Sequence, residues 1–308
     1  MPIESLLLIA ALGATPLAEV AGPISDTRAG RSLDGAWSYI IDPYDHGSID
    51  YWSRPRNDGF WMDAAPASPA ARLEYAFPDE HTLDVPGDWN TQKPELLHYE
   101  GVMWYRTVFD AEPKAELNKP DRSFIRFGTA NKRSTVWLNG ERLGSSAVGF
   151  TPFAFEATDA LRPGANSLVV RVDNARRPDA VPAMQTDWYN YGGLTRSVQL
   201  ITVPETYIAD AHIELTPDQQ RTAGWVKLDG PEAAGATVNV TFAGAPVTLK
   251  TDDHGMASIA MDAQGLPLWS PEAPTLHELE VRIEGDTLRD RVGLRSIDSE
   301  GDQILLNG

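Results

Sequence analysis

Apolar residues along this chain occur in short runs that alternate with polar residues, and no long segment repeats with a helical period. Residues 123–127 alternate in this way, and residues 167–174 do so over half of their length. The pair Asn139-Gly140 separates two apolar runs, which is the strongest local signal for a β-hairpin. Many short strands separated by turn residues predict an antiparallel β-sandwich.

The strand pattern restarts after Val203-Pro204, which predicts a domain boundary there. Seven apolar runs follow, at residues 207–215, 224–228, 236–242, 246–250, 257–261, 277–283 and 287–294. Seven short strands are typical of an immunoglobulin-like sandwich. The Cys…Trp…Cys marker of antibody domains is absent, so the pattern predicts only the architecture.

The N-terminal region contains the apolar run Leu6–Leu12, followed by small residues up to residue 22. Such a run is typical of a secretory signal peptide and is too short to span a bilayer. We expect a leader over residues 1–24 and a secreted or periplasmic protein. Because no basic residue precedes the run, a leader without a targeting role and a cytoplasmic protein are the alternative. Residues 42–94 combine tryptophans with prolines, which predicts long loops packed by aromatic side chains.

Composition narrows the class of partner and cofactor. The net charge of −18 disfavours nucleic acid, since polyanions repel one another and no basic block offsets this charge. The absence of cysteine excludes disulfides and thiolate chemistry but indicates no compartment. The six histidines are not spaced as metal ligands, and the P-loop, dinucleotide and nucleophile-elbow motifs are missing. We therefore expect no metal, no cofactor and no membrane span.

The segment 186–196 carries the clearest candidate chemistry, because it combines three aromatic rings, a carboxylate, an amide and two adjacent glycines. A pyranose has apolar C–H faces and a rim of hydroxyls, so flat rings beside hydrogen-bonding groups favour sugar binding. The Gly192-Gly193 pair predicts a tight backbone path that holds these side chains on a protruding loop. The expected sugar-binding residues are Asp187, Trp188, Tyr189 and Asn190. In the alternative, the carboxylate caps a turn, the rings fill a seam between domains and the asparagine forms a turn.

Other aromatic residues are expected to pack rather than bind. Trp137 precedes a hairpin turn, so we expect it in the core of a sandwich. Trp104 and Tyr105 would point to opposite faces of a strand, which leaves open that one of them is exposed. Packing in a core or at a domain interface is the preferred interpretation for both, and Trp269 is expected to be structural.

Several segments together resemble the non-catalytic front part of glycoside hydrolase family 2, the group of β-galactosidases, β-glucuronidases and β-mannosidases. The similar segments are residues 33–37, 85–90, 101–106, 136–140, 149–153, 187–196, 268–274, 292–295 and 304–308. The resemblance implies an all-β chain with a jelly-roll sugar-binding domain over residues 25–203. It implies an immunoglobulin-like domain over residues 204–297 and a lead-in to a catalytic barrel over residues 298–308.

The resemblance implies a retaining glycosidase whose acid and nucleophile are glutamates of that barrel, about 5–5.5 Å apart. A barrel of eight βα units needs at least about 200 residues, and no segment here fits one. We therefore expect this chain to hold no catalytic residue, to be inactive alone and to shape the active-site rim beside a barrel domain. The loop matching Asp187 to Tyr191 would reach the active-site mouth, where Asp187 contacts a terminal β-glycoside. Other copies in a homo-oligomer are further expected partners.

Two further functions stay open at this point. One is a free-standing, non-catalytic carbohydrate-binding sandwich, which would bind glycans without any other domain. The other is a structural adhesion module without affinity for sugars.

Overall fold

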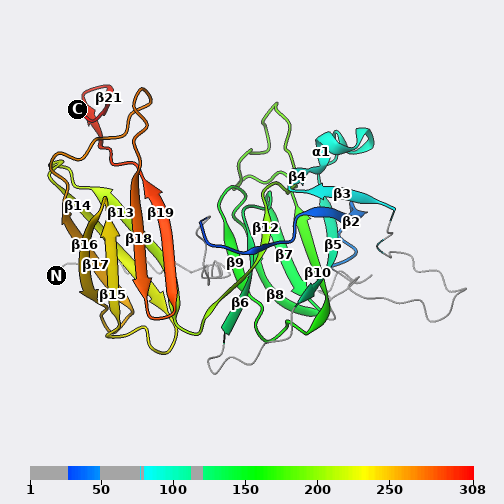
Figure 1. Ribbon diagram of the computed structural model, residues 1–308. Coiled ribbons are helices and arrows are strands. Elements are labelled where there is room, and N and C mark those ends of the chain that lie inside the picture. The colour runs from blue at the N-terminus through cyan, green and yellow to red at the C-terminus, as the bar shows by residue number, and fades with distance from the viewer. Residues whose placement is uncertain (1–26, 49–76, 78–79, 112–120) are drawn as a thin grey trace, which may run out of the picture.

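The computed structural model describes residues 27–48, 77, 80–111 and 121–308 (Figure 1). The leader expected over residues 1–24 lies outside the described residues, as do residues 49–76 of the aromatic, proline-rich stretch. Within the described ranges the helical segments are one turn each, α1 (Trp89–Gln92) and the 3₁₀ segment η1 (Pro94–Leu96). The rest is strand and loop, which confirms the predicted all-β class.

The first sandwich pairs a six-stranded sheet with a four-stranded sheet. The larger sheet has the order β3 (Thr82–Val85), β2 (Gly35–Asp42), β5 (Val102–Ala111), β10 (Gly164–Asp173), β7 (Arg133–Leu138) and β8 (Glu141–Ser146). The smaller sheet has the order β1 (Arg31–Ser32), β12 (Val198–Pro204), β6 (Asp121–Phe127) and β9 (Phe153–Glu156). A short pair, β4 (Gly87–Asp88) with β11 (Gly193–Leu194), closes one end.

Alternation of side chains explains how these sheets bury one core. Along β7, buried and half-buried residues alternate, as expected for a strand with one face inward. Trp37 and Tyr105 from the large sheet meet Phe127 and Phe153 from the small one, all at most 2% exposed. The predicted hairpin forms between β7 and β8, with both turn residues at positive φ, 51° for Asn139 and 94° for Gly140.

Both faces of the six-stranded sheet carry buried clusters, so aromatic residues on either face are packed against neighbours. Tyr105 lies in the main core, and Trp104 faces the other side in a smaller cluster, where it is 1% exposed. Trp137 stacks on Trp104, with ring centroids 5.3 Å apart. Trp269 packs against Gly293 and under the guanidinium of Arg295. All four are packing residues. The expectation for Trp137 is wrong in one respect, because this half-buried ring lies on the face of the sheet opposite the main core and not in the core of the sandwich.

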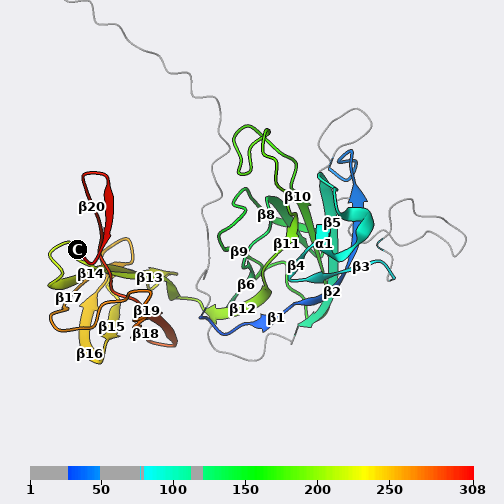
Figure 2. The same cartoon turned by 90° about the horizontal axis from the view of Figure 1, so that it is seen from above.

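The second sandwich packs a three-stranded against a four-stranded sheet. The first has the order β13 (Tyr207–Leu215), β14 (Arg221–Asp229) and β17 (Met256–Asp262); the second has the order β16 (Ala245–Lys250), β15 (Thr237–Phe242), β18 (His277–Ile283) and β19 (Asp286–Val292). Each of the seven apolar runs falls on one of these strands. A hairpin of β20 (Ile297–Glu300) and β21 (Gln303–Leu306) projects from this sandwich (Figure 2). The expected domain limits at residues 203 and 297 are not tested by the structure and stay predictions.

The two sandwiches lie side by side and meet around Tyr207, the first residue of β13 (Figure 1). Its ring is buried against Phe124 and lies 5.9 Å from the guanidinium of Arg28 and 5.2 Å from that of Arg122. Each arginine also pairs with a carboxylate of the second sandwich: Arg28 Nη2 lies 2.6 Å from Asp286 Oδ2, and Arg122 Nη1 lies 3.0 Å from an oxygen of Asp229. The junction is therefore one ring flanked by two ion pairs.

Candidate functional site

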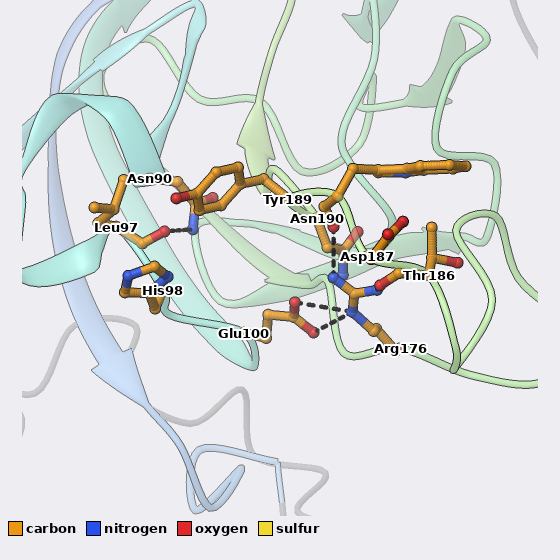
Figure 3. A pocket seen from close by; sticks show the side chains of 10 residues that line it. Asn90, Leu97, His98, Glu100, Arg176, Thr186, Asp187, Tyr189 and Asn190 are labelled. Carbon is orange, nitrogen blue, oxygen red and sulfur yellow. Dashed lines mark hydrogen bonds and ion pairs between the residues drawn. The ribbon is translucent and has the colours of Figure 1, made fainter.

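The loop between β10 and β11 projects from one end of the first sandwich, beside α1 and β4 (Figures 1 and 2). A cavity of about 340 Å³ lies against it (Figure 3). It is lined by Asn90, Leu97, His98, Glu100, Arg176, Thr186, Asp187, Trp188, Tyr189 and Asn190. All four predicted sugar-binding residues therefore border one cavity.

Residues 175–192 contain no strand or helix, so the backbone carbonyls of this loop need partners from elsewhere. Side chains supply them. Asn174 Nδ2 donates to the carbonyl of Asn190 at 2.6 Å, and the side-chain amide of Asn131 donates to that of Tyr191. Lys132 Nζ donates to the carbonyl of Pro182 at 3.2 Å. The loop is thus held by side chains that lie just before β7 and just after β10.

The glycine pair works as the sequence predicted. A Cβ on Gly192 would lie 2.1 Å from Cζ2 of the buried Trp89, so only glycine fits there. Gly193 has φ +138°, and a Cβ on it would lie 2.6 Å from the carbonyl oxygen of Gly87. Two hydrogen bonds fix the same point: Trp89 N donates to the Gly192 carbonyl at 2.9 Å, and Gly192 N donates to Asn90 Oδ1 at 3.0 Å.

Asp187 and Trp188 stand at the exposed part of the loop. Within the described part of the chain, the carboxylate of Asp187 makes no hydrogen bond or ion pair. The Trp188 side chain is 63% exposed. A free acceptor beside an accessible aromatic ring is what a sugar hydroxyl and a sugar C–H face require.

Tyr189 adds a second flat surface at the cavity. Its ring stacks on that of His98, with centroids 5.7 Å apart and 19° between the planes. It also lies 5.8 Å from the ring of Tyr191. Tyr189 is still 47% exposed, so this stack orients the ring without burying it.

Asn190 is placed differently from its neighbours. It is 3% exposed, and its side-chain amide donates to the carbonyl of Asn174, while Asn174 returns a hydrogen bond to the carbonyl of Asn190. This reciprocal pair ties the end of the loop to the segment just after β10. The two residues are 16 apart in the chain and residue 190 lies outside any turn, so the turn-forming interpretation is not supported by these bonds. Direct contact between Asn190 and a sugar stays a prediction.

Six of the ten residues that line the cavity were not among the predicted sugar-binding residues, and those outside segment 186–196 that carry polar side chains are Asn90, His98, Glu100 and Arg176. They come from α1, the segment before β5 and the segment after β10, and no motif connects them. The only hint in the sequence was the dense charge around residues 173–177.

The charge of Arg176 also affects a neighbouring anchor of the loop. Burial, and secondly the positive charge of Arg176, lower the pKa of the Lys132 ammonium.

Neither a metal centre nor a membrane segment is found in the described ranges. No group of three or more histidine, aspartate or glutamate side chains there is arranged to hold a metal ion. No helix among the described residues is long and apolar enough to cross a membrane.

Comparison with known proteins identifies the family. Residues 31–204, more than half of the chain, match the family model described as glycosyl hydrolases family 2, sugar binding domain. The chain belongs to glycoside hydrolase family 2. The match covers the first sandwich and includes every residue that lines the cavity, and it confirms the resemblance based on the sequence segments.

Family 2 relatives resemble the chain in sequence and in structure. A putative β-glucuronidase from Formosa agariphila is 31% identical over 222 residues, covering 65% of this chain and 20% of that protein. A β-galactosidase from Clostridium acetobutylicum is 30% identical over 265 residues, covering 82% and 29%. The solved structure of Bifidobacterium dentium β-glucuronidase complexed with coumarin-3-O-glucuronide superposes with a TM-score of 0.72 at 28% identity, covering 93% and 51%. The chain thus spans between 20% and 51% of the length of these three proteins.

Proposed function

We propose that this chain forms the sugar-facing, non-catalytic rim of a family 2 β-glycosidase, and that the cavity beside Asp187 receives the terminal sugar of a β-glycoside. The observation that carries the proposal is the unpaired Asp187 carboxylate beside the exposed Trp188 ring, within the sugar-binding domain of the family. A carboxylate accepts hydrogen bonds from sugar hydroxyls, and an indole face packs on sugar C–H groups.

The carboxylates of the cavity do not form a hydrolytic pair. Retaining hydrolysis needs one carboxylic acid to protonate the leaving oxygen and a second to attack the sugar. Both oxygens of Glu100 lie against Arg176 Nε, at 2.9 and 3.0 Å, so this side chain is held as an ion-paired acceptor. We therefore expect the acid and nucleophile to come from a catalytic barrel domain that docks beside this rim. A secreted or periplasmic location and contacts between copies of the chain stay predictions.

Binding is tested with the 308-residue chain by saturation-transfer NMR, which detects dissociation constants in the millimolar range. The probes are methyl β-D-galactopyranoside and methyl β-D-glucuronide, since the relatives include both enzyme types. Since a rim forms only part of a sugar pocket, we expect at least one probe to bind weakly, with a dissociation constant in the millimolar range. Asp187→Ala should weaken that binding about tenfold, the loss expected for one charge-assisted hydrogen bond.

Asp253→Ala is the matched control, because Asp253 is an exposed carboxylate of the second sandwich. It should leave binding unchanged. Equal affinities for wild type and Asp187→Ala would refute the assignment of the cavity. Release of nitrophenol from nitrophenyl β-glycosides by the purified chain would refute the non-catalytic role.

A further inference from the structure

Arg176 makes an unusual set of contacts at the loop that carries Asp187. Its Nη1 donates to the carbonyl of Thr186, and its Nη2 donates to the carbonyl of Trp188 at 2.8 Å (Figure 3). These two carbonyls belong to the residues immediately before and after Asp187. One guanidinium therefore binds the backbone on both sides of the free carboxylate.

Glu100 fixes that guanidinium from the opposite edge. Both of its oxygens lie within 3.0 Å of Arg176 Nε, and the arginine side chain is 17% exposed. The two residues lie just outside the ends of strands of the large sheet. Glu100 precedes Gly101, whose amide donates to Asn174 Oδ1 at 2.9 Å, and Asn174 is two residues before Arg176. The segments that flank the start of β5 and the end of β10 thus carry the pair and are joined by this hydrogen bond.

We propose that Arg176 is a positioning residue, which holds the Asp187 loop so that the carboxylate is presented to a sugar. This inference rests on the proposed function of the cavity. A planar guanidinium has five donors in a fixed fork, and here they reach two carbonyls and one carboxylate together. The ammonium of a lysine is a point charge that cannot span the same three acceptors.

The donors of Arg176 go to Glu100 and to the backbone, and none goes to Asp187. Glu100 also balances the charge of the guanidinium. Arg176 therefore orders the loop without occupying the acceptors of Asp187, which stay available to a ligand. A loop that is ordered before binding loses less conformational entropy when the sugar arrives, and this raises affinity.

Three variants separate positioning from a general effect on stability. Arg176→Lys keeps the charge and removes the fork. Arg177→Lys is the matched control, because the neighbouring arginine pairs with Asp173 at 2.9 Å, on the end of β10. The double variant Glu100→Arg with Arg176→Glu restores an ion pair but places no donor at the carbonyls of Thr186 and Trp188.

Two readouts are measured on the 308-residue chain: backbone ¹⁵N order parameters at residues 186–189, and the dissociation constant of the methyl β-glycoside that binds wild type. We expect order parameters of about 0.85 in wild type and below about 0.6 in both Arg176→Lys and the double variant. We expect the dissociation constant to rise about tenfold in both, the effect of ordering roughly one residue on binding. Arg177→Lys should match wild type in both readouts.

Wild-type order in Arg176→Lys, or full recovery of loop order and affinity in the double variant, would overturn the proposal. The latter result would mean that only the ion pair matters. If wild type binds neither probe, the proposed function fails, and the order parameters still decide whether Arg176 holds the loop.

Discussion

The loop of the candidate site packs closely at Gly192, where there is no room for a Cβ atom. We therefore predict that Gly192→Ala destabilises the first sandwich. The new Cβ would lie 2.1 Å from Trp89 Cζ2, 2.3 Å from Cη2 and 2.6 Å from Asn174 Nδ2. Cβ atoms essentially never approach another heavy atom within 3.0 Å, so the first contact is short by 0.9 Å. Either the loop or the indole has to move.

Neither movement is free. The indole is fully buried, and its Nε1 donates to the carbonyl of Tyr99 at 3.2 Å. The loop is held at Gly192 by two hydrogen bonds: Trp89 N donates to the Gly192 carbonyl, and Gly192 N donates to Asn90 Oδ1. Overpacking costs about 1–3 kcal/mol, and a buried hydrogen bond left unmade costs a similar amount. We therefore expect the free energy of unfolding to fall by about 2–5 kcal/mol.

The assay is urea unfolding of the 308-residue chain, followed by tryptophan fluorescence, together with the titration of the methyl β-glycoside. Gly265→Ala is the control, since its Cβ meets no atom within 4 Å and only its φ of +78° is unfavourable. That variant should lose about 1–2 kcal/mol and keep its affinity for the sugar. If Gly192→Ala is as stable as wild type, or no less stable than the control, the steric argument is wrong.

Three other predictions concern the junction and the base of the loop. Asp286→Ala should cost about 3 kcal/mol in urea unfolding, because it leaves the Arg28 guanidinium buried without its carboxylate; an unchanged midpoint would contradict this. The hydrogen bond from Arg122 lowers the pKa of Glu156, so its stabilisation is present above the ordinary value of 4.5 and lost as the pH falls through the folded value. The difference in melting temperature between wild type and Glu156→Gln should therefore be larger at pH 7 than at pH 3, and a constant difference would argue against the pair. Asn174→Ala should cost about 2–4 kcal/mol and weaken sugar binding, as measured by the same titration, since one buried and one partly buried hydrogen bond lose a partner; stability equal to wild type would refute this role.

Much of the fold was predictable because the signals for strands and turns lie in residues that are adjacent in the sequence. The strand signal of residues 123–127 and the Asn139-Gly140 turn depend only on neighbours along the chain, and both the strand and the hairpin appear in the structure. The alternation of residues 123–127 does not become alternate exposure, because all five residues are buried. The seven apolar runs after residue 204 were likewise predictable as strands from their local pattern. The tight path at Gly192 was also predictable, because only glycine tolerates such close backbone approach.

The base of the site was not predictable for the opposite reason. Glu100 and Arg176 are 76 residues apart, and a contact between a side chain and a loop carbonyl produces no periodicity. No signal in the sequence distinguished the buried Asn190 from the exposed residues that precede it. Its burial follows from the reciprocal pairing with Asn174, which only the folded arrangement of β10 and the loop reveals.

The mode of attachment of the β10–β11 loop has a consequence for protein engineering. Every residue type provides a backbone carbonyl, so the anchoring side chains of Asn131, Lys132, Asn174 and Arg176 recognise the path of this segment and not its chemical identity. The tip can therefore be rewritten at residues 187–189 while its trajectory is retained. Libraries confined to those three codons would sample new ligand preferences on an unaltered scaffold.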